Sequence, residues 1–135
     1  LLVDCVGELS AWWGTAQIGF VGGSLGSRGG QNMLEPAAFG VATCFGPNTR
    51  NFRDIVRLLL AADAARVVEH GDALADFVRR CLREPAWAQS LGERARRVVT
   101  ENQGATARTF DRLVGWLEPA HQLALPGRSA PSRAA

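Results

Sequence analysis

The stretch FVGGSLGSRGGQNMLEP, residues 20–36, decides the fold of this chain. It starts at the end of an apolar, β-prone run (residues 18–21), passes through two pairs of glycines, and ends in residues typical of a helix start. Such a run predicts a buried parallel strand. Ligands of open α/β sheets bind beyond the carboxyl ends of the strands, where glycines admit the backbone and a helix N-terminus favours an anion. The stretch therefore predicts a nucleotide or nucleotide-sugar site.

The composition is that of an ordinary globular protein. The chain has 135 residues, 47% of them hydrophobic and 21% charged, which is enough for one domain with a core. A net charge of +2 gives no argument for nucleic-acid or membrane binding. Three widely spaced cysteines suit buried thiols better than disulfides or zinc. The chain opens on a strand-like run without Met, so we expect it to start inside a domain.

Apolar runs and helical periodicity predict alternating strands and helices. We expect strands at 1–4, 18–21, 41–45 and 66–68. We expect helices at 9–16, 34–39, 52–62, 85–102 and 106–117, and one more that starts from a cap at Asp72. Gly92 is expected to weaken the middle of the helix at 85–102. This alternation predicts an α/β fold with a partial doubly wound parallel sheet. Residues 1–118 then form a nucleotide-sugar-binding domain that is incomplete at its N-terminus. Residues 119–135 lack periodicity and are expected to be a disordered tail.

Glu35 is the sharpest candidate for ligand binding. A carboxylate in the first turn of a helix is also favoured by the dipole alone, but the glycine loop before it favours a ligand role. It can accept hydrogen bonds from two ribose hydroxyls. Asn32 caps the helix, contacts the ligand, or does both. Ser24 and the loop backbone either hold a phosphate or sugar carboxylate or only form turns, and Arg28 either adds charge there or is solvated.

The remaining polar and aromatic residues give weaker signals. In the loop 46–52, a loop and cap role is favoured over ligand contact, with Asn51 capping the next helix. His70 and His121 are isolated and do not look catalytic. The tryptophans are expected in the core or against a partner domain, and they are Trp12, Trp13, Trp87 and Trp116.

Two of these segments, 21–25 (VGGSL) and 28–36 (RGGQNMLEP), resemble the signature of bacterial Kdo transferases, the 3-deoxy-D-manno-octulosonic acid transferases of lipopolysaccharide synthesis. Residues 4–9, 45–52 and 101–105 fit the same family in the same order. The resemblance runs over about residues 1–117. It departs from the usual pattern at Cys5 and Val6, where Thr and Met are common, and at Gln31, which replaces a more usual His.

The resemblance implies the C-terminal Rossmann-like half of a two-domain GT-B glycosyltransferase. It implies transfer of Kdo from CMP-Kdo to a lipid A precursor at the cytoplasmic face of the bacterial inner membrane, without a metal or other cofactor. The base and the membrane contact are expected in an absent N-terminal half, so the chain alone is expected to be inactive. The residues implied in binding the nucleotide are Val6, Gly7, Glu8, Asn32, Met33, Leu34 and Glu35. The alternatives are a nucleotide-sugar epimerase of the same architecture and a non-catalytic remnant.

Overall fold

The computed structural model describes residues 2–4, 6–104 and 109–115. The chain divides into two compact units, Leu1–Gln103 and Gly104–Ala135. In the second unit, residues 109–115 are helical, within the helix predicted for 106–117. The predicted disordered tail, 119–135, lies outside the described residues, and the extent of the donor domain (1–118) stays a prediction.

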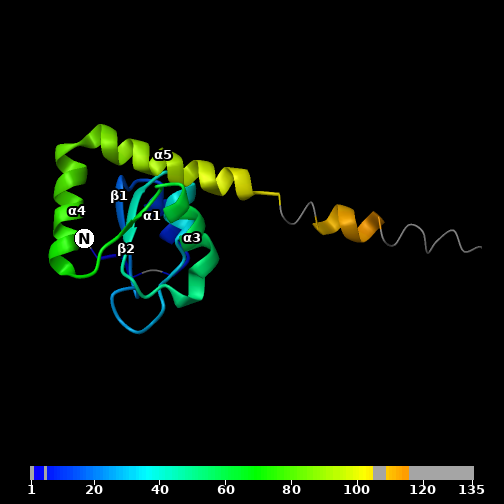
Figure 1. Cartoon of the computed structure of the whole chain (residues 1–135), viewed down its shortest axis with the longest axis horizontal. Coiled ribbons are helices and arrows are strands. Elements are labelled where there is room, and N and C mark those ends of the chain that lie inside the picture. Colours follow the sequence, from blue (N-terminus) through cyan, green and yellow to red (C-terminus); the bar gives the residue numbers. More distant parts are fainter. Residues whose placement is uncertain (1, 5, 105–108, 116–135) are drawn as a thin grey trace, which may run out of the picture. The chain divides into compact units, whose positions relative to one another are not determined.

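The first unit is built on a parallel sheet. Its strands are β1 (Ile18–Val21), β2 (Ala42–Phe45) and β3 (Arg66–Val67), in the order β1-β2-β3 (Figure 1). Ile18 lies opposite Ala42, and Phe45 lies opposite both Val21 and Val67. Because all the strands point the same way, the loops after β1 and β2 meet at one edge of the sheet. The predicted parallel α/β fold is confirmed.

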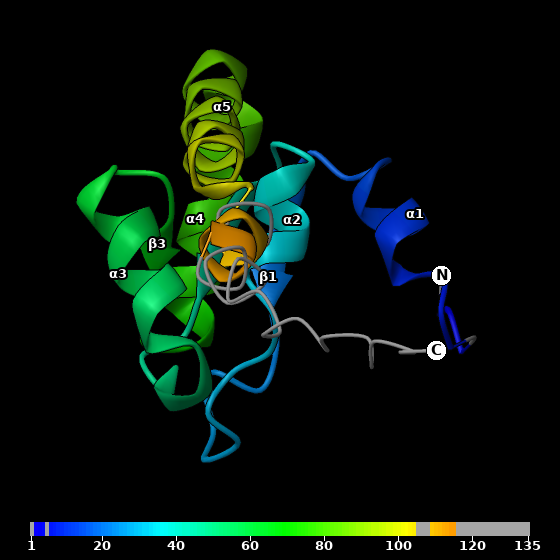
Figure 2. The same cartoon turned by 90° about the vertical axis from the view of Figure 1, so that its right-hand side faces the viewer.

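Helices cover both faces of this sheet. They are α1 (Leu9–Trp13), α2 (Leu34–Ala38), the 3₁₀ turn η1 (Arg50–Phe52), α3 (Arg53–Ala61), α4 (Gly71–Arg83) and α5 (Pro85–Asn102). Side chains alternate along a strand. Val21 and Phe45 accordingly pack in one cluster with α2, α3 and α5, while Phe20 and Cys44 pack in another with α4 and the start of α5. Figures 1 and 2 show α3 and α4 on opposite sides of the sheet.

Gly92 strengthens the packing of α5, although the sequence predicted a weak point there. A Cβ at Gly92 would overlap the carbonyl oxygen of Gly40, in the turn between α2 and β2. The missing side chain therefore lets the helix backbone rest directly on that turn. The helical cost of glycine is offset by this contact with the turn.

Three further predictions about elements were wrong. Residues 2–4 are not a strand, since the described sheet consists of β1, β2 and β3 alone. Helix α1 ends at Trp13 instead of continuing to residue 16. Helix α4 is capped by His70, whose Nδ1 accepts from the Ala73 N–H at 3.3 Å, so Asp72 lies inside the first turn. The other elements predicted before residue 104 agree to within one residue at each end.

Candidate functional site

Two of the residues predicted to bind a ligand, Asn32 and Glu35, lie together where β1 ends. A cavity of about 480 Å³ opens there, within the size range of small-molecule sites. Its walls come from α1, the end of β1, the glycine loop and the first turn of α2. The lining residues are Leu9, Trp13, Phe20, Val21, Gly22, Gln31, Asn32 and Glu35.

Asn32 and Glu35 form a hydrogen-bonded pair in this cavity. Nδ2 of Asn32 donates to Oε1 of Glu35 at 3.1 Å, and Oδ1 of Asn32 accepts from the Leu34 N–H at 3.0 Å. The prediction that Asn32 accepts a backbone N–H at the helix start is confirmed. The backbone thus orients the amide, and the amide orients the carboxylate. Oε2 of Glu35 makes no hydrogen bond to the residues that the structure describes, so it is free to accept from a ligand.

Ser24 and Met33 are buried instead of facing the cavity. The Ser24 hydroxyl donates to the Val21 carbonyl at 2.5 Å and accepts from the Gly46 N–H at 2.8 Å, which joins the glycine loop to the end of β2. The Met33 side chain is part of the core cluster under α2. Both side chains shape the loop from within. Ligand contacts by these two residues stay predictions. Such contacts would involve their backbone atoms, because the side chains are buried.

The turn Val6-Gly7-Glu8 is placed at the entrance to α1. All three residues are exposed, and Gly7 has a φ of +98°, a conformation that suits glycine. The Glu8 carbonyl accepts from Ala11 N–H at 3.0 Å, while its side chain makes no capping bond. None of the three lines the cavity, although the next residue, Leu9, does. Their contact with a nucleotide stays a prediction.

Trp13 is a wall of the cavity that sequence reasoning assigned only to packing. A Cβ on Gly19 would lie 2.8 Å from Cζ3 of Trp13, so the ring lies directly over the strand. Its Nε1 is buried and has no hydrogen-bond partner among the described residues. A glycine within a strand marks a close approach, and here it admits the ring. The cavity therefore joins an aromatic wall to a carboxylate, which suits a nucleoside.

Asn51 tethers the glycine loop, whereas the sequence predicted that it would cap a helix. Its Nδ2 donates to the Arg28 carbonyl at 2.9 Å, and its backbone N–H donates to the Gly29 carbonyl at 3.2 Å. The loop also closes on itself, since the Gly30 N–H donates to the Gly23 carbonyl at 3.0 Å. These bonds hold the loop in place before any ligand binds.

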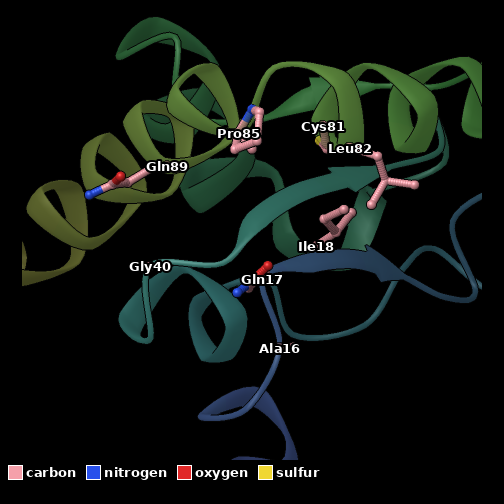
Figure 3. Close-up of a pocket in the computed structure, with 9 residues that line it drawn as sticks. Ala16, Gln17, Ile18, Gly40, Cys81, Leu82, Pro85 and Gln89 are labelled. Atoms are coloured by element: carbon pink, nitrogen blue, oxygen red, sulfur yellow. The ribbon is translucent and has the colours of Figure 1, made fainter.

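A larger cavity, of about 530 Å³, lies at the opposite end of the sheet (Figure 3). The start of β1 (Gln17, Ile18), α4 (Cys81, Leu82) and α5 (Pro85, Gln89) contribute to its lining, and no lining side chain is charged. Burial and the neighbouring Cys81 raise the pKa of Cys44, behind this wall, to about 12. Burial also raises the pKa of Cys81. A raised pKa keeps both thiols protonated at neutral pH, which makes them poor nucleophiles.

The described part of the chain holds no cluster of three or more His, Cys, Asp and Glu side chains that could bind a metal ion. No helix within it is long and apolar enough to cross a membrane.

Sequence comparison identifies the relatives of this chain. It is 39% identical over 117 residues to the 3-deoxy-D-manno-octulosonic acid transferase of Bordetella pertussis, and the match covers 87% of the chain. The enzyme of the same name from Haemophilus influenzae is 39% identical over 119 residues, again 87% of the chain. The chain is a homologue of the Kdo transferases. It spans only 27% of the first relative and 28% of the second. No protein-family model matches it.

A solved structure supports the same relationship. The C-terminal CMP-Kdo-binding domain of WaaA from Acinetobacter baumannii matches this Kdo transferase homologue with a TM-score of 0.69 and 36% identity. The match covers 73% of this chain and 51% of that domain. The predicted fold, the C-terminal half of a GT-B glycosyltransferase, is thereby confirmed. These relatives favour the transferase over the epimerase alternative.

Proposed function

We propose that this chain supplies the donor-binding half of a Kdo transferase, which moves Kdo from CMP-Kdo to a lipid A precursor. The observation that carries the proposal is the Asn32–Glu35 pair, which opens on the cavity at the carboxyl end of β1. This pair lies in segment 28–36, which resembles the signature of the Kdo transferases. The solved relative is named for binding CMP-Kdo, which supports a cytidine nucleotide as the ligand.

Each wall of the cavity has a role in holding the donor. The free oxygen of Glu35 accepts from the ribose hydroxyls, while Asn32 keeps the carboxylate in position. Trp13 and Phe20 offer aromatic surface to the rest of the nucleoside. We assign the phosphate to the backbone at Gly22, which lines the cavity and has no side chain to intervene.

The reaction needs groups beyond these. The acceptor hydroxyl attacks the anomeric carbon of Kdo, the bond to CMP breaks with its electron pair on the phosphate oxygen, and a base takes the hydroxyl proton. We assign no residue of this chain as that base. The chain binds and orients the donor, without metal or other cofactor. We place the complete enzyme at the cytoplasmic face of the bacterial inner membrane, where its lipid acceptor is found.

Calorimetric titration with CMP tests the donor assignment. Glu35→Gln removes the charge but keeps the shape, and the loss of charge-assisted hydrogen bonds, roughly 1.5–3 kcal/mol, should weaken CMP binding about 10- to 100-fold. Glu93→Gln is the matched control, because Glu93 is an exposed acid of α5 that accepts from Gln89 Nε2 at 2.9 Å. It should bind CMP as the parent protein does. Equal affinity in all three proteins, each folded by circular dichroism, would contradict the proposal.

A further inference from the structure

A second cavity lies against the same glycine loop and shares no residue with the first. Its volume is about 360 Å³. The loop contributes Ser27 and Gly29, and the segment after β2 contributes the rest of the lining, namely Pro47, Asn48, Thr49, Arg50 and Arg53. None of these residues lines the cavity of Asn32 and Glu35. The loop therefore borders two separate cavities.

The charge of this second cavity is positive and uncompensated. Arg50 and Arg53 line it, and no acidic residue does. Neither arginine forms an ion pair with the residues that the structure describes. Asp54, the acid next to Arg53, is instead 3.8 Å from Arg57. Two arginines thus line this cavity, and no acidic side chain lines it to balance their charge.

The stem of Arg50 packs against the glycine loop. A Cβ on Gly29 would lie 2.7 Å from Cγ of Arg50 and 3.0 Å from its Nε, so the arginine stem lies over the loop backbone. Gly29 has a φ of +88°, which other residues rarely adopt. The side chain therefore rests on a glycine that both the conformation and the space require.

Hydrogen bonds also fix the wall of the cavity. The Asn48 N–H donates to the Ser24 carbonyl at 2.9 Å, and the Asn51 N–H donates to the Gly29 carbonyl at 3.2 Å. They join the glycine loop to the segment after β2, through residues that are more than twenty positions apart in sequence. A wall fixed in advance loses little conformational entropy when a ligand binds.

The chemistry of the lining suits an oxyanion. Arginine binds phosphate and carboxylate groups through paired N–H donors. Ser27, Asn48 and Thr49 add hydroxyl and amide donors beside the two charges. A phosphate monoester carries about −1.5 to −2 at pH 7, which matches two arginines. The volume, at the low end for ligand sites, holds a phosphate with a small attached group.

We propose that this arginine-lined cavity binds a phosphate monoester other than the donor nucleotide. The ligand is either a small soluble phosphate ester or the headgroup of a phosphate-bearing lipid. The proposal rests on the separate lining and charge of the cavity, and it does not depend on the assignment of the nucleotide.

Titration with inorganic phosphate, followed by NMR in low-salt buffer, tests the proposal. Phosphate should bind equally well with and without saturating CMP. Because charged hydrogen bonds are lost, the double variant Arg50→Gln/Arg53→Gln should bind phosphate at least about tenfold more weakly. Arg83→Gln is the matched control, since Arg83 is an exposed arginine in the last turn of α4. It should leave phosphate binding unchanged.

Two results would overturn the proposal: competition between CMP and phosphate, or equal phosphate binding by the double variant and the parent protein. Both of the replaced arginines are exposed, so circular dichroism should show an intact fold. Failure of CMP to bind would contradict the donor assignment. The comparison of phosphate binding by the double variant and the parent protein would still test the arginine-lined cavity.

The source of the phosphate is decided by two further probes. Glucose 1-phosphate represents a soluble ester, and phosphatidylcholine vesicles that contain phosphatidic acid represent a lipid headgroup. Binding of either probe that is lost in the double variant supports the site and identifies the class of ligand. Binding of neither probe, or binding that the double variant retains, would count against it.

Discussion

The two ends of the sheet differ in what they offer a ligand. The amino end has the largest of the three cavities, about 530 Å³, lined by apolar and amide side chains with two inert thiols close by. The carboxyl end has smaller cavities, about 480 and 360 Å³, which include a carboxylate and two guanidinium groups. Size alone would favour the amino end. The charged groups that lie beyond the carboxyl ends of the parallel strands favour the carboxyl end as the ligand site.

The two ends are also built differently. At the amino end, backbones pack directly against each other, as where Gly92 meets Gly40. At the carboxyl end, the backbones of Gly46 and Ser24 also lie close together, and there a hydrogen bond from the Gly46 N–H to the Ser24 hydroxyl joins the two loops. We infer that the amino end carries stability and that the carboxyl end carries recognition. Substitutions at the two ends should therefore have different kinds of effect.

The largest effect is expected at Gly92. A Cβ there would overlap the Gly40 carbonyl, which is backbone and cannot turn aside, so Gly92→Ala should cost about 1–3 kcal/mol or more in the free energy of unfolding. Urea denaturation followed by circular dichroism measures it. Gly71→Ala is the control, because Gly71 starts α4 with nothing near the new methyl group, and it should be neutral or slightly stabilising. Equal stability of Gly92→Ala and the parent protein would contradict the packing role.

A smaller effect is expected from Asn32→Asp. The new side chain still accepts from the Leu34 N–H, but it brings a second carboxylate to Glu35 in place of an N–H donor. CMP should bind about three- to tenfold more weakly, as charge repulsion disturbs Glu35, and added salt should restore part of the affinity. Calorimetry at two ionic strengths measures both changes.

The control for this variant lies at the amino end. Gln89→Glu creates the same kind of carboxylate pair, because Gln89 donates to Glu93, and Gln89 lines the larger cavity. It should leave CMP affinity unchanged. If Gln89→Glu weakened CMP binding as much as Asn32→Asp, the distinction between the two ends would be wrong.

The smallest effect near neutral pH is expected from ionisation of the buried Cys44 thiol. Its pKa is raised to about 12 in the folded chain, against about 8.5 for an unfolded cysteine. Its contribution to stability is therefore complete below about pH 8.5 and is lost as the pH rises from about 8.5 to 12. Alkylation of the Cys44 peptide by iodoacetamide at pH 8, followed by mass spectrometry, should be slow until denaturant is added. Rapid alkylation of the native protein would show that the thiol is accessible.

The sequence predicted the parts of the molecule that depend on neighbouring residues. Strand β1, helix α5 and the bond from the Leu34 N–H to Asn32 follow from an apolar run, from Pro85 and from groups two residues apart. The roles of Ser24, Asn51, Gly92 and Trp13 did not follow. Each depends on a contact that the fold creates, such as the bond from Gly46 to Ser24, 22 residues away. Asn32 and Glu35 were therefore each identified from sequence, whereas the hydrogen bond between them and the aromatic wall beside them needed the structure.

The central claim is that the nucleotide binds at the carboxyl end of β1, although the larger cavity is at the amino end. Titration of the ¹⁵N-labelled protein with CMP, followed by two-dimensional NMR, tests it most directly. The account predicts the largest shift changes at the amides of Gly22 and residues 31–35, with little change at Gln17 or residues 81–89. Changes centred on Gln17 and residues 81–89, with residues 31–35 unmoved, would contradict it.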